Sequence, residues 1–249
     1  MSQVLTQYLG IKKGDVIAVV GSGGKTSLIE KLANERKEIN GSKILISPTT
    51  RIMMPESGTV ILSDWQDYMP AAGISYFGTI NGEDGKLHAI PQDVLRVVVQ
   101  GFDLSLLEAD GSRNLPWKGW DYTDPVIPAG TTMTLGVISA KGIGLSATEE
   151  NVFRLREFLE TTGLREGDKI TINAAVKSVL ARNGMFWNKK GRKAIFINQA
   201  EGEYEEVAKD LRHAIRKVGF FGKIAYGSIN DDWYKSLCKI KREMNPGSL

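Results

Sequence analysis

The sequence predicts an α/β protein in which helices cover both faces of a mostly parallel sheet. The first observation is an alternation of short β-branched runs with segments whose apolar residues recur at helical spacing. The second is the glycine, proline or serine that bounds each of these runs. Alternating strands and helices form parallel sheets with right-handed crossovers, which leaves few topologies to consider.

The first half of the chain contains four expected strands and two expected helices. A β-branched run at 16–20 ends in glycines, and apolar residues at helical spacing follow it over 26–36. A proline at the first position favours a helix over 91–101. The remaining apolar runs, bounded by turn residues, predict strands at 43–47, 59–63 and 103–108.

The second half begins with a segment, 112–130, whose prolines and glycines predict an ordered functional loop. Ser146 and Glu149 have the spacing of a capping box, which predicts a helix from there to about Thr162. We expect further helices at 168–182 and 203–218, and strands at 133–139, 193–198 and 223–226.

Length and composition are those of an ordinary globular protein. The chain has 249 residues, of which 42% are hydrophobic and 24% charged, so disorder and fibrous repeats are excluded. We expect residues 1–249 to form a single nucleotide-binding α/β domain. Cys238 is the only cysteine, so an intramolecular disulfide is excluded and an inert thiol is expected.

The charge pattern predicts neither a nucleic-acid partner nor a membrane partner. The net charge is only +3, and the basic residues gather only near the C-terminus. We interpret that cluster as a solvated helix face: Lys235, Lys239, Lys241 and Arg242. No run reaches the roughly 18 apolar residues of a membrane span, and the N-terminus lacks a signal pattern, so a cytoplasmic location is expected.

A glycine-rich loop joins the first strand to the first helix and predicts a phosphate-binding site of the P-loop NTPase type. Small residues let backbone N–H groups turn toward a phosphate, and the start of a helix adds partial positive charge. Lys25 is expected to reach the β- and γ-phosphates and Thr26 to bind Mg²⁺. The loop consists of Gly21, Ser22, Gly23, Gly24, Lys25, Thr26 and Ser27.

The match to the common P-loop pattern is incomplete. That pattern has a glycine five residues before the Gly-Lys pair, where this sequence has Val19, so the loop is a shortened variant. A glycine-rich turn carrying an exposed lysine is the alternative interpretation. The strand before the loop and the helix after it favour phosphate binding.

Two acidic residues at the end of the strand 103–108 are candidate magnesium ligands. Glu108 and Asp110 are two residues apart, so both face one side if the strand continues that far. Oxygen ligands of this type suit Mg²⁺ and its bound waters. For Asp110 a tight turn with Gly111 is the alternative, whereas a buried Glu108 needs a charged partner or a metal.

Several polar residues near other strand ends are further candidates. Arg113 and Lys118 either stabilise charge on a phosphoryl group or are solvated loop cations. Asn198 lies in a partial match to the element with which many GTPases bind guanine. The segment after the second strand supplies three candidate nucleotide-binding residues: Thr49, Thr50 and Arg51. A turn that begins at Pro48 is the alternative explanation for this segment.

Three stretches of the chain resemble the YqeC-type family of accessory proteins of selenium-dependent molybdenum hydroxylases. They are 21–27, 47–52, and 107–113 with 124–128 after it. The Glu-Ala-Asp-Gly-Ser-Arg run that starts at Glu108 is the most distinctive. The family has a longer threonine run in the second stretch, and often a His-Glu-Pro where this chain reads Thr123-Asp124-Pro125.

The resemblance implies a role in maturing a selenium-dependent molybdenum hydroxylase or its molybdenum cofactor. The residues themselves predict only a nucleoside triphosphate, ATP or GTP, with Mg²⁺, and Lys25, Glu108, Asp110 and Arg113 as the catalytic candidates. Two alternatives stay open. One is phosphoryl transfer to a small molecule, as in Mur ligases or kinases. The other is a non-catalytic, nucleotide-sensing module that docks an apoenzyme. Trp117 and Trp120 are candidate anchors for that partner, and burial of both rings within the loop is the commoner explanation.

Overall fold

The computed structural model of the protein describes residues 4–55, 59–61, 68–80 and 85–236. Ser63, Cys238 and the basic residues at 239, 241 and 242 lie outside these ranges. Within them, one large sheet contains β1 (Asp15–Gly21), β2 (Lys43–Pro48), β4 (Thr59–Ile61), β5 (Gly73–Phe77), β7 (Leu104–Glu108), β9 (Met133–Ser139), β11 (Arg192–Asn198), β12 (Lys223–Ser228) and β13 (Trp233–Ser236).

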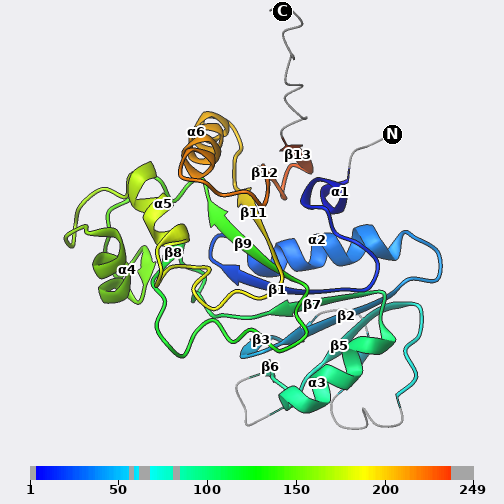
Figure 1. Ribbon diagram of the computed structural model, residues 1–249. Coiled ribbons are helices and arrows are strands. Elements are labelled where there is room, and N and C mark those ends of the chain that lie inside the picture. Colours follow the sequence, from blue (N-terminus) through cyan, green and yellow to red (C-terminus); the bar gives the residue numbers. More distant parts are fainter. Residues whose placement is uncertain (1–3, 56–58, 62–67, 81–84, 237–249) are drawn as a thin grey trace, which may run out of the picture.

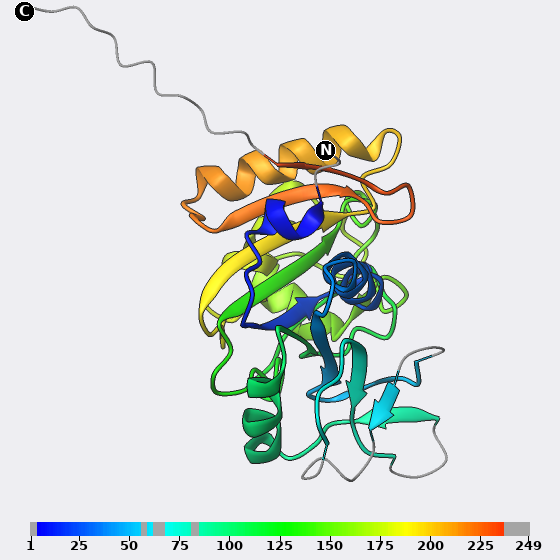
Figure 2. The same ribbon diagram turned by 90° about the vertical axis from the view of Figure 1, so that its right-hand side faces the viewer.

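The strand order across this sheet is β13-β12-β11-β9-β1-β7-β2-β5-β4. All neighbouring pairs are parallel except β12 with β13. Figure 2 shows the twisted succession from β12 in orange, through β1 in blue, to the cyan strands. The predicted α/β fold with a mostly parallel sheet is confirmed, and β1 lies between β9 and β7 inside it.

Helices pack on both faces of the sheet (Figure 1). Alternate side chains of β1 enter two different apolar clusters, because successive residues of a strand point to opposite faces. Ile17 and Val19 pack with α1 (Leu5–Leu9) and α2 (Lys25–Lys37). Ala18 and Val20 face the other way, where α4 (Leu155–Thr162), α5 (Ile172–Leu180) and α6 (Tyr204–Lys217) pack.

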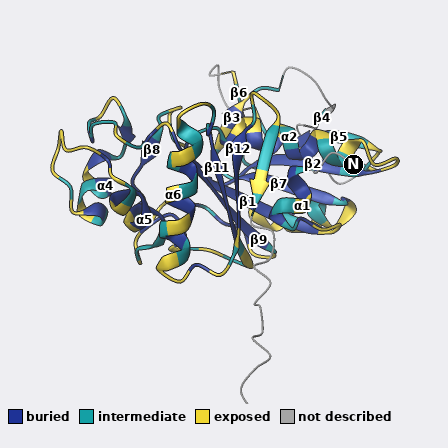
Figure 3. Ribbon diagram, turned by 90° about the horizontal axis from the view of Figure 1, so that it is seen from above, coloured by how far each residue is buried: buried dark blue, intermediate teal, exposed yellow. Residues whose placement is uncertain are grey.

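A third cluster covers the β2–β5 end of that second face. Leu45 and Leu107 pack there with Phe77 and with Val94 and Leu95 of α3 (Gln92–Val98). A 3-10 turn at Val99–Gly101 extends α3, which confirms the helix expected at 91–101. Figure 3 shows the result, with dark blue buried strands between helices that are yellow on their outer sides.

Two short ribbons lie outside the large sheet. β3 (Arg51–Met53) pairs antiparallel with β6 (Lys86–His88), and β8 (Trp117–Lys118) pairs parallel with β10 (Val152–Phe153). The sequence predicted none of these, nor α1, β5 and β13. Within the described ranges, no helix is both long and apolar enough to cross a membrane.

The helix expected from Ser146 begins nine residues later, so the capping-box prediction is wrong. Ser146 bridges to Lys169, and its carbonyl accepts a hydrogen bond from the Asn151 side chain. Val152 and Phe153 are strand residues, and the left-handed backbone of Arg154, with φ 56°, turns the chain into α4. Pairing with β8 therefore determines the structure of these residues, against the local helix pattern.

The helix expected at 168–182 is also shorter than predicted. α5 begins at Ile172, and the Thr171 hydroxyl accepts a hydrogen bond from the Ala174 N–H at 3.2 Å as its N-cap. Asp168 instead accepts one from the Arg165 N–H within the preceding turn. The predicted last strand at 223–226 forms as β12, but β13 follows it as an antiparallel edge.

Candidate functional site

The glycine-rich loop runs from the end of β1 at Gly21 to the start of α2 at Lys25, at the carboxyl edge of the sheet. Gly21, Gly23 and Gly24 have φ values of 107°, 88° and 106°, which disfavour any residue with a side chain. The fold also leaves no room for one. A Cβ on Gly21 would lie 2.2 Å from the Val137 carbonyl oxygen, and one on Gly23 would lie 2.8 Å from the Ser139 nitrogen.

The loop presents the start of α2 without a side-chain cap. Gly24 is the N-cap residue and has no side chain to accept from the N–H groups of the first turn. These N–H groups have no carbonyl partner within a helix and carry partial positive charge. The end of α2 nearest the loop can therefore bind an anion.

Lys25 is buried and forms the centre of the site. Its ammonium donates to the Gly21 carbonyl at 2.8 Å and to the Ser112 hydroxyl at 3.3 Å. The same nitrogen lies 3.3 Å from Asp110 and 4.0 Å from Glu108. The structure thus brings the two carboxylates that the sequence singled out to the same lysine, although β7 ends at Glu108 and Asp110 lies beyond the strand.

Asp110 is fully buried and is bonded to the protein on several sides. Its Oδ2 atom accepts from the Gly21 N–H at 2.9 Å and the Trp120 indole N–H at 3.1 Å, and lies 3.2 Å from the Lys118 ammonium. Burial alone raises the pKa of this carboxyl, but the charges of Lys118 and Lys25 outweigh it and hold the pKa below its usual value. Asp110 therefore stays ionised and holds the loop in position.

Lys118 is a buried cation shared by two carboxylates. It donates to the Gly111 carbonyl at 2.6 Å and contacts both Asp110 and Asp124. Asp124 also pairs with Arg154 at 3.1 Å. Burial and the nearby charge of Asp110 raise the pKa of Asp124, against the attraction of Lys118. Lys118 is therefore part of the internal support of the site and is not a solvated loop cation.

Glu108 is less enclosed than Asp110 and lies against the helix. Its Oε2 atom accepts a hydrogen bond from the Thr26 hydroxyl at 3.0 Å. Burial raises the pKa of Glu108, with Lys25 and the Thr26 hydroxyl opposing the shift. A hydroxyl and a carboxylate at this spacing are oxygen ligands of the kind that Mg²⁺ takes from protein. The fit is better for Glu108 than for Asp110, whose oxygens already face Lys25 and Lys118.

A cavity of about 580 Å³ opens over the loop and the first turn of α2. Thr26, Ser27 and Glu108 line one part of it, and Ser112 and Asn114 come from the segment after β7. Pro116 lines it as well, and five wall residues from later in the chain were not among the predicted site residues: Ser139, Lys141, Leu145, Gln199 and Tyr204. They lie up to about 180 positions from the loop, so no local sequence pattern connects them to it.

A second cavity of about 700 Å³ meets the first at Thr26 and Glu108, which line both. Its other walls come from α2, from β2 and β5, and from the segment 52–55. The side chains include Glu30, Asn34 and Lys37. The two cavities thus share Thr26 and Glu108, whose side chains are joined by a hydrogen bond. No group of three or more His, Cys, Asp or Glu that could hold a metal ion exists among the described residues.

Other predicted site residues lie outside the walls of both cavities. The Thr49 N–H and hydroxyl donate to the Glu108 carbonyl at 2.9 Å and the Val126 carbonyl at 2.7 Å, so this residue joins three segments. Thr50 has a buried hydroxyl without a hydrogen-bond partner among the described residues, and Arg51 is an exposed residue of β3. Arg113 is exposed and stacks over the Phe153 ring.

Asn198 and Ser22 contact neighbouring backbone. The Asn198 amide donates to the Gly23 carbonyl at 2.9 Å and accepts from the Ile229 N–H at 3.3 Å, so its side chain braces the loop from β11. The Ser22 hydroxyl donates to the Pro116 carbonyl at 2.8 Å. Both residues therefore have a structural use at the loop that is independent of any ligand.

The comparisons with known proteins agree with one another. The family model described as "YqeC protein" matches residues 17–156, which include the loop and both carboxylates. The chain is also 32% identical over 198 residues to a protein of Escherichia coli (strain K12) described as "Uncharacterized protein YqeC". That alignment covers 76% of this chain and 77% of the relative.

Proposed function

Because the chain belongs to the YqeC family, and the matched region contains the loop and both carboxylates, we propose that the protein binds and hydrolyses a nucleoside triphosphate with Mg²⁺. The observation that carries this proposal is the placement of Lys25, Thr26 and Glu108 in one cavity at the uncapped start of α2. This would make the chain a P-loop NTPase-like protein with a shortened loop. The volume of this cavity, about 580 Å³, is in the range of small-molecule sites.

In this proposal the loop and the start of α2 hold the phosphates. The N–H groups of the first turn and the ammonium of Lys25 donate to phosphate oxygens. Lys25 exchanges part of its present pairing with Asp110 for the nucleotide, while Lys118 keeps Asp110 neutralised. Thr26 and Glu108 would hold Mg²⁺, which supplies charge compensation for the phosphates.

The segment after β7 would follow the state of the nucleotide. The Ser112 hydroxyl already contacts the Lys25 ammonium, and Asn114 lines the cavity. Arg113 lies between them in sequence, is exposed and stacks over the Phe153 ring, so a rearrangement of this segment that releases it from that ring would make it available to the phosphates. The base of the nucleotide would lie toward Leu145, Gln199 and Tyr204, farther along the same cavity.

Turnover of ATP and GTP by the purified protein, with and without Mg²⁺, tests the proposal. We expect slow Mg²⁺-dependent release of phosphate that Lys25→Ala abolishes, since the phosphates lose their buried cation. Glu108→Gln is expected to lower turnover at least tenfold and to weaken the Mg²⁺ dependence. Equal turnover by the wild type and the Lys25 variant would contradict the proposal.

The second cavity favours one alternative, transfer of the phosphoryl group to a small molecule. It shares Thr26 and Glu108 with the cavity over the glycine-rich loop, so an acceptor bound there would adjoin the proposed Mg²⁺ ligands. Analysis of the reaction products with a library of small hydroxyl and carboxylate compounds distinguishes the two functions. A phosphorylated compound in place of free phosphate would indicate a transferase.

For the biological role, we propose that the nucleotide cycle serves the maturation of a selenium-dependent molybdenum hydroxylase or its molybdenum cofactor. This proposal rests on the family resemblance of the motifs. The exposed Arg113 and Asn114 beside the cavity would report the nucleotide state to the client apoenzyme. Capture of the apoenzyme by the wild type with nucleotide, but not without it, is the expected result. Capture without turnover would favour the non-catalytic sensing module.

A further inference from the structure

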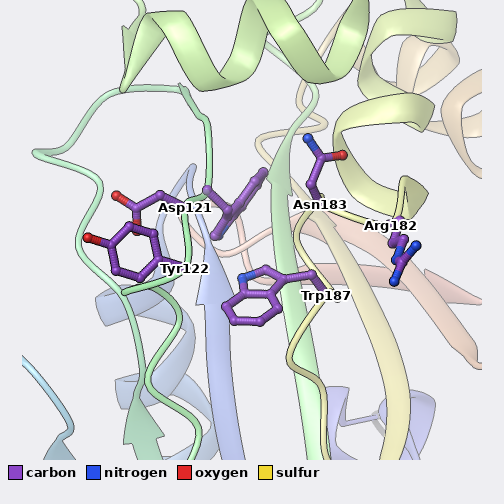
Figure 4. Close-up of a pocket in the computed structure, with 6 residues that line it drawn as sticks. Asp121, Tyr122, Arg182, Asn183 and Trp187 are labelled. Atoms are coloured by element: carbon purple, nitrogen blue, oxygen red, sulfur yellow. The ribbon is translucent and has the colours of Figure 1, made fainter.

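A separate, largely aromatic pocket of about 430 Å³ lies beside the loop that follows β8 and the loop that follows α5. Trp120, Asp121 and Tyr122 come from the first loop, and Arg182, Asn183 and Trp187 from the second. Figure 4 shows Trp187 between Tyr122 and Asp121 on one side and Asn183 and Arg182 on the other. Nothing in the proposed nucleotide site uses these side chains as ligands.

The two tryptophans are fixed by hydrogen bonds to the protein. The Trp187 indole N–H donates to the Asp124 carbonyl at 2.9 Å, and the Trp120 indole N–H donates to Asp110 at 3.1 Å. Their polar atoms are therefore satisfied, and what the pocket offers a ligand is apolar ring surface. Trp187 keeps 38% of its surface exposed and Tyr122 keeps 89%, although both are large aromatic residues. The Trp187 ring is fixed by its hydrogen bond and the Tyr122 ring is exposed beside it, and exposed aromatic rings favour stacking with a flat partner.

The two charged groups at the pocket differ in whether a neighbouring group compensates their charge. Asp121 lies 3.0 Å from the Arg154 guanidinium and accepts hydrogen bonds from the Thr123 N–H and hydroxyl, so its charge is compensated. Asn183 is held by a hydrogen bond to Thr161 at 2.8 Å. Arg182 is exposed and has no carboxylate partner among the described residues. The pocket therefore carries one uncompensated positive charge next to its ring surface.

We propose that this pocket binds a small planar aromatic anion, with its rings against Trp187 and Tyr122 and its carboxylate or phosphate group on Arg182. The volume accommodates a fused two-ring molecule with room for substituents. Arg182 selects against an organic cation, which an aromatic pocket would otherwise also accept. The site is independent of the proposed nucleotide chemistry, so its occupancy can be measured in the absence of any nucleotide.

Isothermal titration calorimetry with three matched probes tests this site. The probes are 2-naphthoate, its saturated analogue decahydro-2-naphthoate, and the cation 2-naphthylmethylammonium. A two-ring probe of this size is expected to bind with a Kd of about 1 mM or tighter. We expect the saturated anion and the aromatic cation to bind at least tenfold more weakly than 2-naphthoate.

Three variants locate the binding in this pocket. Tyr122→Ala and Trp187→Ala are each expected to weaken 2-naphthoate binding about tenfold, and Arg182→Gln about fivefold. Phe221→Ala is the matched control, because Phe221 is an aromatic residue that is 94% exposed and lies outside the pocket wall, so no change is expected. Tyr122 is exposed enough that its variant should fold normally, which far-UV circular dichroism checks.

Three results would overturn the proposal. One is the absence of saturable heat with 2-naphthoate at millimolar concentration. Another is binding that is unchanged in the folded Tyr122 and Arg182 variants. The third is tighter binding of the cation than of the anion. None of these results would affect the nucleotide proposal, which the Lys25 variant tests separately.

Discussion

At the scale of single residues, Lys118 shows how the position of one cation determines the roles of its neighbours. It is fully buried and contacts two buried carboxylates, so Asp110 has a second cation beside it in addition to Lys25. Asp110 thereby becomes a fixed part of the loop, while Glu108 remains the carboxylate at the cavity wall.

Lys118→Met should lower the free energy of unfolding by about 3 kcal/mol, because it leaves Asp110 and Asp124 buried without their shared cation. The matched control is Lys13→Met. Lys13 pairs with Asp103 at 3.1 Å but has 78% of its side chain exposed, and a loss below about 1 kcal/mol is expected. Urea unfolding at pH 7 measures both. Similar losses for the two variants would contradict the structural role of Lys118.

The sequence identified the main residues of the candidate site but not the separate roles of its two carboxylates. Lys25, Thr26, Glu108 and Asp110 were recognised because each stands beside a strand or helix boundary that the local pattern predicts. The separate roles of Glu108 and Asp110 could not be predicted, because Lys118 and Trp120 reach Asp110 only through the folded path of the loop.

At the scale of elements, strand β1 is joined to distant segments at both ends. The glycine-rich loop closes onto β9 and β11 at the carboxyl end. At the other end, Asp15 pairs with Arg192 at the start of β11 and accepts from the Thr132 hydroxyl at 2.9 Å. These contacts of Asp15 hold β1 and β11 in register at the edge of the sheet away from the glycine-rich loop.

Asp15→Asn should reduce stability in a pH-dependent way. Burial alone raises the pKa of Asp15, but its hydrogen bonds with Arg192, the Lys12 N–H and Thr132 prevail and lower it. A carboxyl with a lowered pKa contributes stability above its unfolded value of about 3.9 and loses it as the pH falls through the folded pKa. We expect a loss of about 2 kcal/mol at pH 7.

Urea midpoints of the wild type and the Asp15 variant, compared at pH 7 and near pH 3, check this expectation. The gap between the two urea midpoints should be largest at pH 7. It should narrow below the unfolded pKa of about 3.9, as the pH falls toward the lowered pKa of the folded wild-type carboxyl. A gap of constant size at both pH values would show that the charge of Asp15 contributes nothing.

The predicted elements that were correct and those that were missed differ in the range of their contacts. The long apolar runs of β1, β7, β9 and β11 are buried on both faces, so their composition alone identifies them. β10 was mistaken for helix because a local capping pattern precedes it, whereas its pairing partner β8 lies about 35 residues away. Two- and three-residue strands give no periodic signal to read.

At the scale of the whole molecule, a ligand in the cavity over the glycine-rich loop should stabilise the entire sheet. The cavity is lined by residues of α2, β7, β9 and α6, so a bound nucleotide would join both halves of the chain. The sequence predicted the parallel sheet with helices on both faces, but the order of its strands follows from packing that no local pattern encodes.

Mg²⁺ with the bound triphosphate at a hundredfold excess over its Kd should add about 2.7 kcal/mol to the free energy of unfolding. For a chain of this length the Tm should rise by about 5–10 °C. Differential scanning fluorimetry measures the shift. Mg²⁺ with the unphosphorylated nucleoside is the ligand control, and Lys25→Ala is the protein control. An equal shift in either control would argue against phosphate binding at the loop.

The central position of β1 has a consequence for the synthesis of the protein. β1 leaves the ribosome well before its partners β7 and β9 are made. The Gly21 N–H cannot form its hydrogen bond until Asp110, 89 residues further on, has been made. The Ser22 N–H likewise has no acceptor until Val137 has been made. A nascent chain that has not reached Ser139 therefore carries an apolar strand with open edges, which is the kind of segment that chaperones protect.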